Sequence, residues 1–429
     1  MKSLFSDTPC FRGGVAKIRA ASTATVPAKK PRLNAADGMR FFLILHIVLG
    51  HFLHFAGPSD LVMKFFAQIN VTVGAFFALS GYVSAYTTSN TGALGTTEKF
   101  QATGIKKWIL SKIFGYYPLY LLVLLLASPM FLMTNFHYGG PVAALVNTVM
   151  SCTLIQAWFP NHAEGWNAST WFLSAMTFGT LVSAVAMEPI CKMDKKDLKK
   201  AGIGLWLATV IPRLAYAWEQ GCWQVVEGMT SPKAHPALAM FNFQRFHPLV
   251  TGWPEMLLGM IACRWIMMND AEFKENPTHK GLSNGTILPI AGLIGVLLAR
   301  ATGVVPAVSD LLVRSVVFVP LFLCFVMASH RQAVAGKPDM VNKFLAQELF
   351  SSRLAGLAFP IYIVHGPLGQ LFYKKYVATK VFGQVLQGPV AFAAYLALTA
   401  SVAYAIQELF LKNKAVGRWS KKQVERLSA

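Results

Sequence analysis

The residues of this chain that could do chemistry are concentrated in one apolar stretch, RFFLILHIVLGHFLH. Its Arg40 and His51 are eleven residues apart, which in an α-helix is three turns plus about 20° and a rise of roughly 16 Å. The two side chains are therefore expected on one helix face. By the same geometry His46 lies about 140° and His54 about 60° around the helix from His51.

A guanidinium and an imidazole on one face suggest two separate tasks for one site. Arginine binds phosphate groups well, and a neutral imidazole can take up a proton near neutral pH. The pair predicts a tunnel in which an anionic substrate enters at Arg40 and meets a base at His51. The alternative is that His51 only hydrogen-bonds a neighbouring backbone carbonyl.

A second histidine, His365 in FPIYIVHGPLGQLF, is expected at a similar depth in the membrane. Two histidines from different helices could flank one reaction centre. Pro360 and Pro367 bracket His365, and we expect them to free backbone carbonyls for polar contacts.

Two other polar residues interrupt apolar runs, which makes each a candidate for function. Ser80 in VTVGAFFALSG could hydrogen-bond a ligand, although close packing at Gly81 explains this stretch equally well. Glu255 in GWPEMLLGM needs a partner for its carboxylate. It could orient a histidine, or it could pair with Arg264 or another basic residue.

The elements that must position these residues are membrane-spanning helices. The chain is 54% hydrophobic and only 14% charged, with a mean hydropathy of +0.46, whereas a soluble domain carries about 25% charged residues. Backbone groups in lipid must satisfy one another, so the apolar runs should be helices. We expect an all-α integral membrane bundle of about ten transmembrane helices, at residues 40–57, 65–88, 113–133, 169–190, 201–219, 248–268, 284–303, 309–329, 354–373 and 389–411.

One further apolar stretch, residues 139–158, could be an eleventh span or a re-entrant segment. If it crossed, the basic cluster at Lys192–Lys200 would lie outside, against the positive-inside rule. We therefore predict that it does not cross and that both termini are cytosolic. The net charge of +20 then reflects topology, and because the basic residues are scattered over several loops, a nucleic-acid partner is not expected.

Three regions follow from this pattern. Residues 1–36 form a basic N-terminal tail, either disordered or a targeting segment. Residues 37–411 form one transmembrane domain, and residues 412–429 a basic cytosolic tail. The six cysteines lack metal-site spacing, so no metal or cofactor is expected. Asn167-Ala168-Ser169 is a glycosylation sequon on the predicted outer side.

The same stretches resemble the acyltransferase 3 family of multi-pass membrane acyltransferases. Asp37-Gly38-Met39-Arg40 with His51 is similar to that family's Asp-Gly-Leu-Arg opening and Arg-x10-His motif. Further similarity lies in Val73–Gly81 (Phe-Phe-x-x-Ser-Gly), Trp171–Ser174 with Pro189 (Trp-x-Leu-Ser and Pro), Pro254–Met260 (Glu-Phe-Leu-Leu-Gly-Met), Pro360–Leu368 (Tyr-Leu-x-His-x-Pro-Leu) and Glu408. The chain departs from the family where a paired Arg-x-x-Arg motif is usual, because Lys112 and Gly115 stand there.

The resemblance implies transfer of an acyl group, usually from acyl-CoA, to a hydroxyl or amine of a carbohydrate or lipid acceptor. It implies His51 as the catalytic histidine and Arg40 as its motif partner. His51 would act as general base on the acceptor, or it would itself carry the acyl group as a covalent nucleophile. His365 and Ser80 would then orient substrate or stabilise the thioester oxyanion. CoA is strongly anionic, and Arg40, Lys106, Lys107 and Lys112 would collect its phosphates at the cytosolic face. The other expected substrate-binding residues are Ser80, Trp171, Ser174 and Glu255.

Two other functions stay open from the sequence. The protein could be a transporter of an anionic or lipid-like solute that uses the histidines as a proton relay. It could also be a non-catalytic membrane binding protein on the same fold. The oligomeric state is not determined by any of these patterns.

Overall fold

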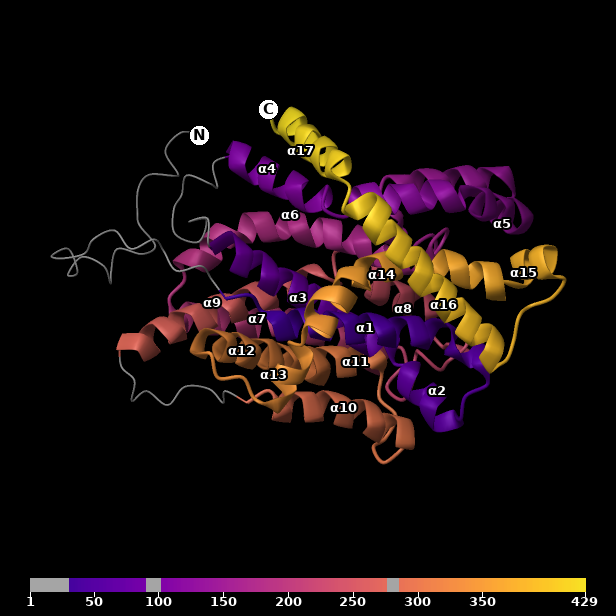
Figure 1. The fold of residues 1–429 in the computed structure, drawn as a ribbon. Helices are drawn as coiled ribbons and strands as arrows, with labels where there is room; N and C mark the ends of the chain where they lie inside the picture. Colours follow the sequence, from indigo (N-terminus) through magenta and orange to yellow (C-terminus); the bar gives the residue numbers. More distant parts are fainter. Residues whose placement is uncertain (1–30, 90–101, 276–284) are drawn as a thin grey trace.

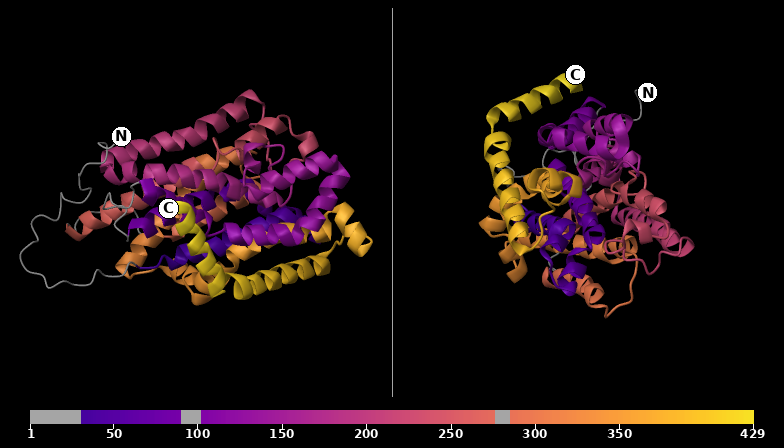
Figure 2. Two further views of the ribbon diagram at one scale, coloured as in Figure 1. Left: turned by 90° about the horizontal axis from the view of Figure 1, so that it is seen from above. Right: turned by 90° about the vertical axis from the view of Figure 1, so that its right-hand side faces the viewer.

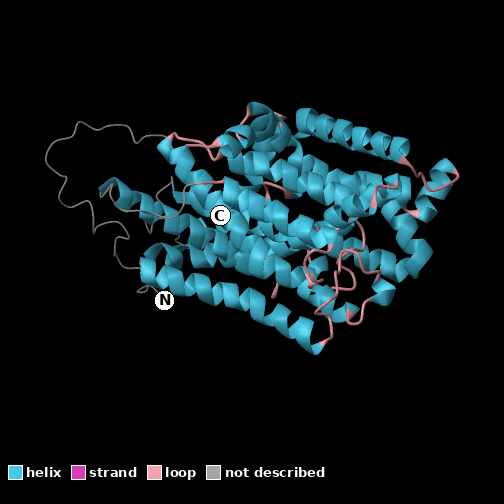
Figure 3. Cartoon of the chain, turned by 90° about the horizontal axis from the view of Figure 1, so that it is seen from below, coloured by secondary structure: helices cyan, strands magenta, loops and turns pink. Residues whose placement is uncertain are grey.

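The computed structural model describes residues 31–89, 102–275 and 285–429. Within these residues all regular secondary structure is helical. The long helices run side by side along one axis (Figure 1), which two further directions of view also show (Figure 2). Most of the connecting loops lie toward the two ends of this bundle (Figure 3). The predicted all-α membrane fold is thereby confirmed.

Seven helices among the described residues are long and apolar enough to cross a membrane. They are Asn34–Ala56, Asp60–Thr88, Gly104–Cys152, Ala168–Lys192, Asp310–Ala335, Leu349–Tyr373 and Pro389–Leu411, and each overlaps one predicted span. The other three predicted spans correspond to α7 (Lys195–Glu219), α9 (Trp253–Glu275) and α10 (Ile287–Thr302). These helices are shorter or more polar than the seven, so the predicted number of ten is not confirmed.

The remaining helices keep the order that the apolar runs suggested. They are α1 (Asn34–Phe52), α2 (Asp60–Phe66), α3 (Ile69–Ser89), α4 (Ala102–Ile113), α5 (Tyr117–Cys152), α6 (Trp171–Lys192), α8 (Leu238–Phe246), α11 (Asp310–Val313), α12 (Val319–Ala335), α13 (Met340–Leu345), α14 (Ala355–Tyr373), α15 (Lys375–Phe382), α16 (Pro389–Ile406) and α17 (Lys414–Ser428). Short π-helical turns precede α12 and α14 and follow α16.

The ambiguous stretch 139–158 is the second arm of a helical hairpin within α5. The chain turns at Gly140, whose φ of 73° lies in the left-handed region that glycine adopts readily. The Tyr117 and Tyr120 hydroxyls donate to the carbonyls of Cys152 and Ser151 at 2.8 and 2.7 Å. The second arm therefore returns along the first, and that it does not cross the membrane stays a prediction.

The contact between α3 and α9 is close enough to involve the two backbones. A Cβ atom on Gly81 would collide with the Met256 carbonyl oxygen, and one on Gly259 would collide with the Ala78 carbonyl oxygen. Small residues allow such contacts in membranes, where helices gain little from hydrophobic burial. This contact fixes α3, with Ser80, against α9, with Glu255.

Most of the predicted C-terminal tail is helical. Helix α17 packs on α4, with the Trp419 and Phe114 ring centroids 6.0 Å apart. The described start of the chain and α17 lie toward the same end of the bundle (Figure 2). The predicted N-terminal tail lies mainly outside the described residues, and a cytosolic location of both ends stays a prediction.

Replacing Gly81 by leucine should destabilise the protein strongly. The added side chain would have to displace the α9 backbone at Met256, and overpacking typically costs about 1–3 kcal/mol. We expect a clear fall in the melting temperature of the purified protein in detergent. Gly204→Leu on α7 is the matched control, because a Cβ at Gly204 meets nothing within 4 Å. Equal melting temperatures for the two variants would contradict the backbone contact.

Candidate active site

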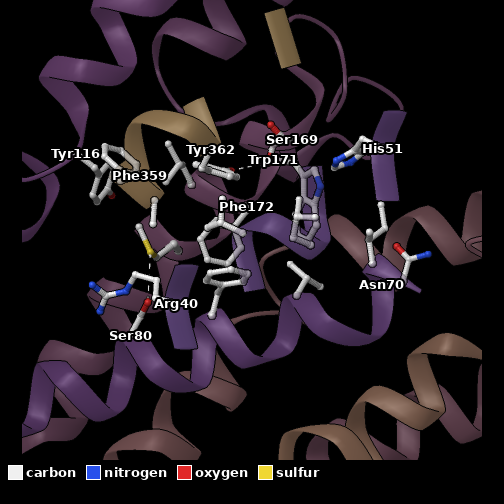
Figure 4. A pocket seen from close by; sticks show the side chains of 18 of the residues that line it. Arg40, His51, Asn70, Ser80, Tyr116, Ser169, Trp171, Phe172, Phe359 and Tyr362 are labelled. Atoms are coloured by element: carbon white, nitrogen blue, oxygen red, sulfur yellow. Dashed lines mark hydrogen bonds between the residues drawn. The ribbon is translucent and has the colours of Figure 1, made fainter. Parts of the chain in front are cut away.

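Arg40 and His51 line one cavity of about 390 Å³ inside the bundle. Figure 4 shows Arg40 beside Ser80 toward one end and His51 beside Asn70 toward the other. Phe172 and Trp171 lie between these ends, whereas Tyr116 and Phe359 lie toward the Arg40 side. The predicted shared face of Arg40 and His51 is therefore the wall of a real cavity.

His51 meets His365 at the far end of this cavity from Arg40. His51 Nδ1 and His365 Nε2 are 3.4 Å apart, and the ring centroids are 5.3 Å apart. His365 Nδ1 lies 2.7 Å from the Tyr362 carbonyl oxygen, which can only accept a hydrogen bond. In neutral rings, His365 Nδ1 is therefore protonated and its Nε2 accepts from His51 Nδ1. This arrangement leaves His51 Nε2 unprotonated and available as a base.

Proline shapes α14 around His365 in the expected way. Pro367 has no N–H, so the carbonyl of Ile363, four residues earlier, lacks its helical partner. Asn167 Nδ2 donates to this carbonyl at 2.8 Å, which confirms the prediction that proline frees a carbonyl for a polar contact. Asn167 is only 2% exposed. The sequon is therefore buried in the folded protein, and its place on the outer side of the membrane stays a prediction.

The loop that precedes α6 is folded into the bundle, where hydrogen bonds hold it against α14. The Tyr362 hydroxyl donates to the Ser169 carbonyl at 2.7 Å, and Gln370 Nε2 donates to the Trp166 carbonyl at 2.8 Å. Ser169 consequently lines the cavity. The Ser174 hydroxyl donates to the Leu154 carbonyl at 2.6 Å. Ser174 thus anchors this loop and does not line the cavity, contrary to its predicted role in substrate binding.

Glu255 also lies outside the cavity wall and forms a buried ion cluster instead. Its Oε1 accepts from Arg213 at 2.9 Å and from Arg314 at 2.7 Å, while Oε2 accepts from the Gly252 backbone N–H at 2.9 Å. All three charged side chains are at most 1% exposed. The alternative of pairing with a basic residue is confirmed, but the partners are two arginines rather than Arg264 or a histidine.

The predicted substrate-binding residues are divided by this geometry. Ser80 and Trp171 line the cavity. Lys106 and Lys107 are exposed on α4, and Lys112 is stacked 5.3 Å from the centre of the Trp108 ring. Helix α4 leads directly to Gly115, which lines the cavity together with Arg40. These three lysines do not line the cavity, and their role in substrate binding stays a prediction.

Several lining residues were not predicted from the sequence. Asn70, Tyr116, Tyr362 and Arg245 all contribute to the wall. Arg245 belongs to the short helix α8. No spacing rule links α8 to the Arg40–His51 face, since the contact arises from tertiary packing.

His46, the other histidine of α1, lies away from the cavity that contains His51. His46 lines a separate, largely apolar cavity of about 600 Å³ between α1, α2, α10 and α13. Its ring packs against Phe65 and Phe66, with ring centroids 5.7 and 5.3 Å away. His46 is thus excluded from the His51 centre, as its angular position on the helix suggested.

Comparison with known proteins adds an independent line of argument. The family model described as an acyltransferase domain (Acyl_transf_3) matches residues 33–408. The chain belongs to this family. No curated protein and no solved structure gives a significant match. The resemblance seen in the motifs is confirmed, and it supports an acyltransferase-type function for the membrane bundle.

Removing the charge of Glu255 should destabilise this acyltransferase domain. Glu255→Gln leaves two guanidinium groups buried with a neutral partner, and breaking a buried pair in this way costs about 3–5 kcal/mol. We expect a large fall in melting temperature in detergent. Glu348→Gln is the matched control, because Glu348 and Arg353 are 73% and 72% exposed and exposed pairs contribute at most about 1 kcal/mol. A Glu255→Gln variant as stable as Glu348→Gln would disprove a structural role for the cluster.

Proposed function

We propose that this protein transfers an acyl group from acyl-CoA to a hydroxyl or amine of a carbohydrate or lipid acceptor. The observation that carries the proposal is a single cavity with Arg40 toward one end and His51 toward the other. Membership of the acyltransferase domain family supports the reaction class. Acyl-CoA as the donor and a carbohydrate or lipid as the acceptor go beyond what family membership supports.

The Arg40 end suits the donor. The Arg40 side chain is 36% exposed and bonded to Asp37 at 3.4 Å, so it can exchange partners with a phosphate that arrives from solvent. The lysines of α4 add positive charge near this end. A cavity of about 390 Å³ has room for a drug-sized group. The thioester arm of acyl-CoA would therefore enter the cavity, while its nucleotide stays at the mouth.

His51 is assigned as the general base. Its Nε2 takes the proton from the acceptor hydroxyl as the acceptor oxygen attacks the thioester carbonyl carbon. The carbon–sulfur bond then breaks, and the imidazolium returns the proton to the CoA thiolate. The products are an ester and CoA with a free thiol. His365 is a positioning residue, since it fixes which nitrogen of His51 is protonated.

Replacing His51 should remove activity without removing the fold. In His51→Ala the base is lost, and we expect the transfer rate to fall by about 10²–10⁴-fold. The measurement is release of CoA thiol from acetyl-CoA and from one long-chain acyl-CoA by purified protein in detergent. His46→Gln is the matched control, because His46 lies on the same helix but in the other cavity.

The same assay separates the proposal from its rivals. A transporter would move solute without consuming thioester, and a non-catalytic binder would bind acyl-CoA without forming product. Normal turnover by His51→Ala would disprove the assignment of the base. Absence of turnover in the wild-type protein would favour the two rival functions.

The residue at position 365 should determine kcat, because its side chain accepts the hydrogen bond from His51 Nδ1. His365→Leu removes the acceptor for His51 Nδ1, and loss of such an orienting partner typically costs about 10–100-fold. In His365→Gln the amide oxygen can still accept that hydrogen bond, so we expect a partial rescue of kcat. The measurement is kcat and KM for acyl-CoA in both variants. Equal kcat values for the two would mean that His365 only fills space.

A further inference from the structure

Arg245 is a cavity-lining residue that the proposed reaction leaves without a role. Helix α8 brings its side chain into the same cavity as His51. Its guanidinium carbon lies 4.5 Å from the centre of the Phe246 ring and 5.8 Å from that of Trp171. Its charge is close enough to the His51 imidazole for the two to interact. Aromatic packing thus holds a cation near the proposed base.

Most of the hydrogen-bonding capacity of Arg245 is unused. A guanidinium carries five N–H donors. Among the described residues, its one ion pair is with Glu164, at 3.4 Å from Nη1, and the Glu164 side chain is 48% exposed. The Arg245 side chain is only 14% exposed. Its Nε is buried and has no hydrogen-bond partner. Unsatisfied donors in such a place favour an acceptor-rich ligand.

The charged side chains near Arg245 also favour a negatively charged ligand. The main charged neighbours of the buried Arg314 are Glu255, Arg213 and Arg245. Together with Glu164, whose side chain is 48% exposed beside Arg245, two carboxylates face three guanidinium groups. Arg314 itself has Nε and Nη1 without partners. At low dielectric, an excess positive charge attracts an anion strongly.

The other buried acids in this part of the bundle are already committed. Asp310 pairs with Arg300 at 2.7 Å, and its carboxylate also accepts from Asn70 at 3.4 Å. Glu227 accepts from the Ser309 hydroxyl. Burial, together with the charge of Asp310, raises the pKa of Glu227 well above its usual range, so that its carboxyl tends to stay neutral. Neither acid is therefore bonded to Arg245.

The position of Arg245 indicates which substrate it would meet. Arg40 lies roughly 16 Å along α1 from His51, and it is the residue assigned to the donor. Arg245 is near His51, and its exposed partner Glu164 shows that solvent reaches it on that side. An acceptor bound at Arg245 would therefore lie in the same cavity as His51 without displacing a donor held at Arg40.

We infer that Arg245 binds an oxyanion group, a carboxylate or a phosphate, on the acceptor, and thereby makes the transfer selective for anionic acceptors that carry a free hydroxyl. The planar guanidinium can bind either group with two parallel hydrogen bonds. Glu164 would be displaced from Arg245 as the acceptor binds. This inference rests on the proposed function for the role of the ligand, but not for the existence of the anion site.

The experiment measures binding without turnover. Glucuronate and glycerol 3-phosphate are titrated calorimetrically into the purified full-length protein in detergent, with glucose and glycerol as neutral counterparts. Saturating CoA is present throughout, so that the Arg40 end is occupied. We expect the wild-type protein to prefer at least one anionic probe over its neutral counterpart by about 10–100-fold. The preferred probe identifies carboxylate or phosphate as the group.

Variants connect the preference to Arg245. Arg245→Gln should abolish it, while Arg245→Lys should keep part of it, because lysine retains the charge but not the fork of donors. Arg353→Gln, which removes an exposed arginine, controls for general effects of net charge. Melting temperatures establish that each variant is folded. An unchanged preference in Arg245→Gln, or no preference in the wild-type protein, would overturn the inference.

A transfer assay with the same four probes separates the two proposals. If wild-type protein consumes no acyl-CoA with any acceptor, the proposed function fails while the Arg245 binding result stands. If wild-type protein and Arg245→Gln both acylate glucuronate and glucose with the same ratio of kcat/KM, the inference fails while the proposed function stands.

Discussion

Polar groups inside a membrane bundle have no water to bond with, and the structure depends on how each of them finds a partner within the protein. Glu255 accepts from two arginines and a backbone N–H. Asn167 donates to a carbonyl that Pro367 leaves free. These bonds connect α9 to α7 and the loop before α6 to α14. The need to pair buried polar groups therefore also holds in place the helices and the loop around the cavity.

This bonding also determines which nitrogen of His51, the proposed base, is unprotonated, and it starts from a backbone atom. The Tyr362 carbonyl accepts from His365 Nδ1, which makes His365 Nε2 an acceptor for His51 Nδ1. Each step follows from which atoms can donate and which can only accept. A base of defined tautomer thus needs no carboxylate beside it. Glu255, the acid that the sequence suggested for orienting a histidine, is bonded to Arg213 and Arg314 instead.

The parts of the fold and site that sequence could predict are those determined within one helix. The shared face of Arg40 and His51 follows from helical periodicity, and the carbonyl freed by Pro367 follows from the missing N–H. Contacts between distant segments could not be predicted in this way. Arg245 reaches the cavity through packing of α8, and Ser174 bonds to a loop that only the fold brings near. A serine in an apolar run shows that a partner is needed, but not whether that partner is a ligand or the backbone.

The two arginines of the cavity differ in a way that suits different ligands. Arg40 is 36% exposed and already bonded to Asp37, so water and salt weaken its attraction for any anion. Such a site releases its ligand easily, as turnover of a donor requires. Arg245 is 14% exposed, stacked on aromatic rings and short of partners, so an anion there interacts through a lower dielectric. Strong interaction with a poorly hydrated cation discriminates between charged and neutral groups. The more buried arginine is therefore the better place for selectivity, and the more exposed one for exchange.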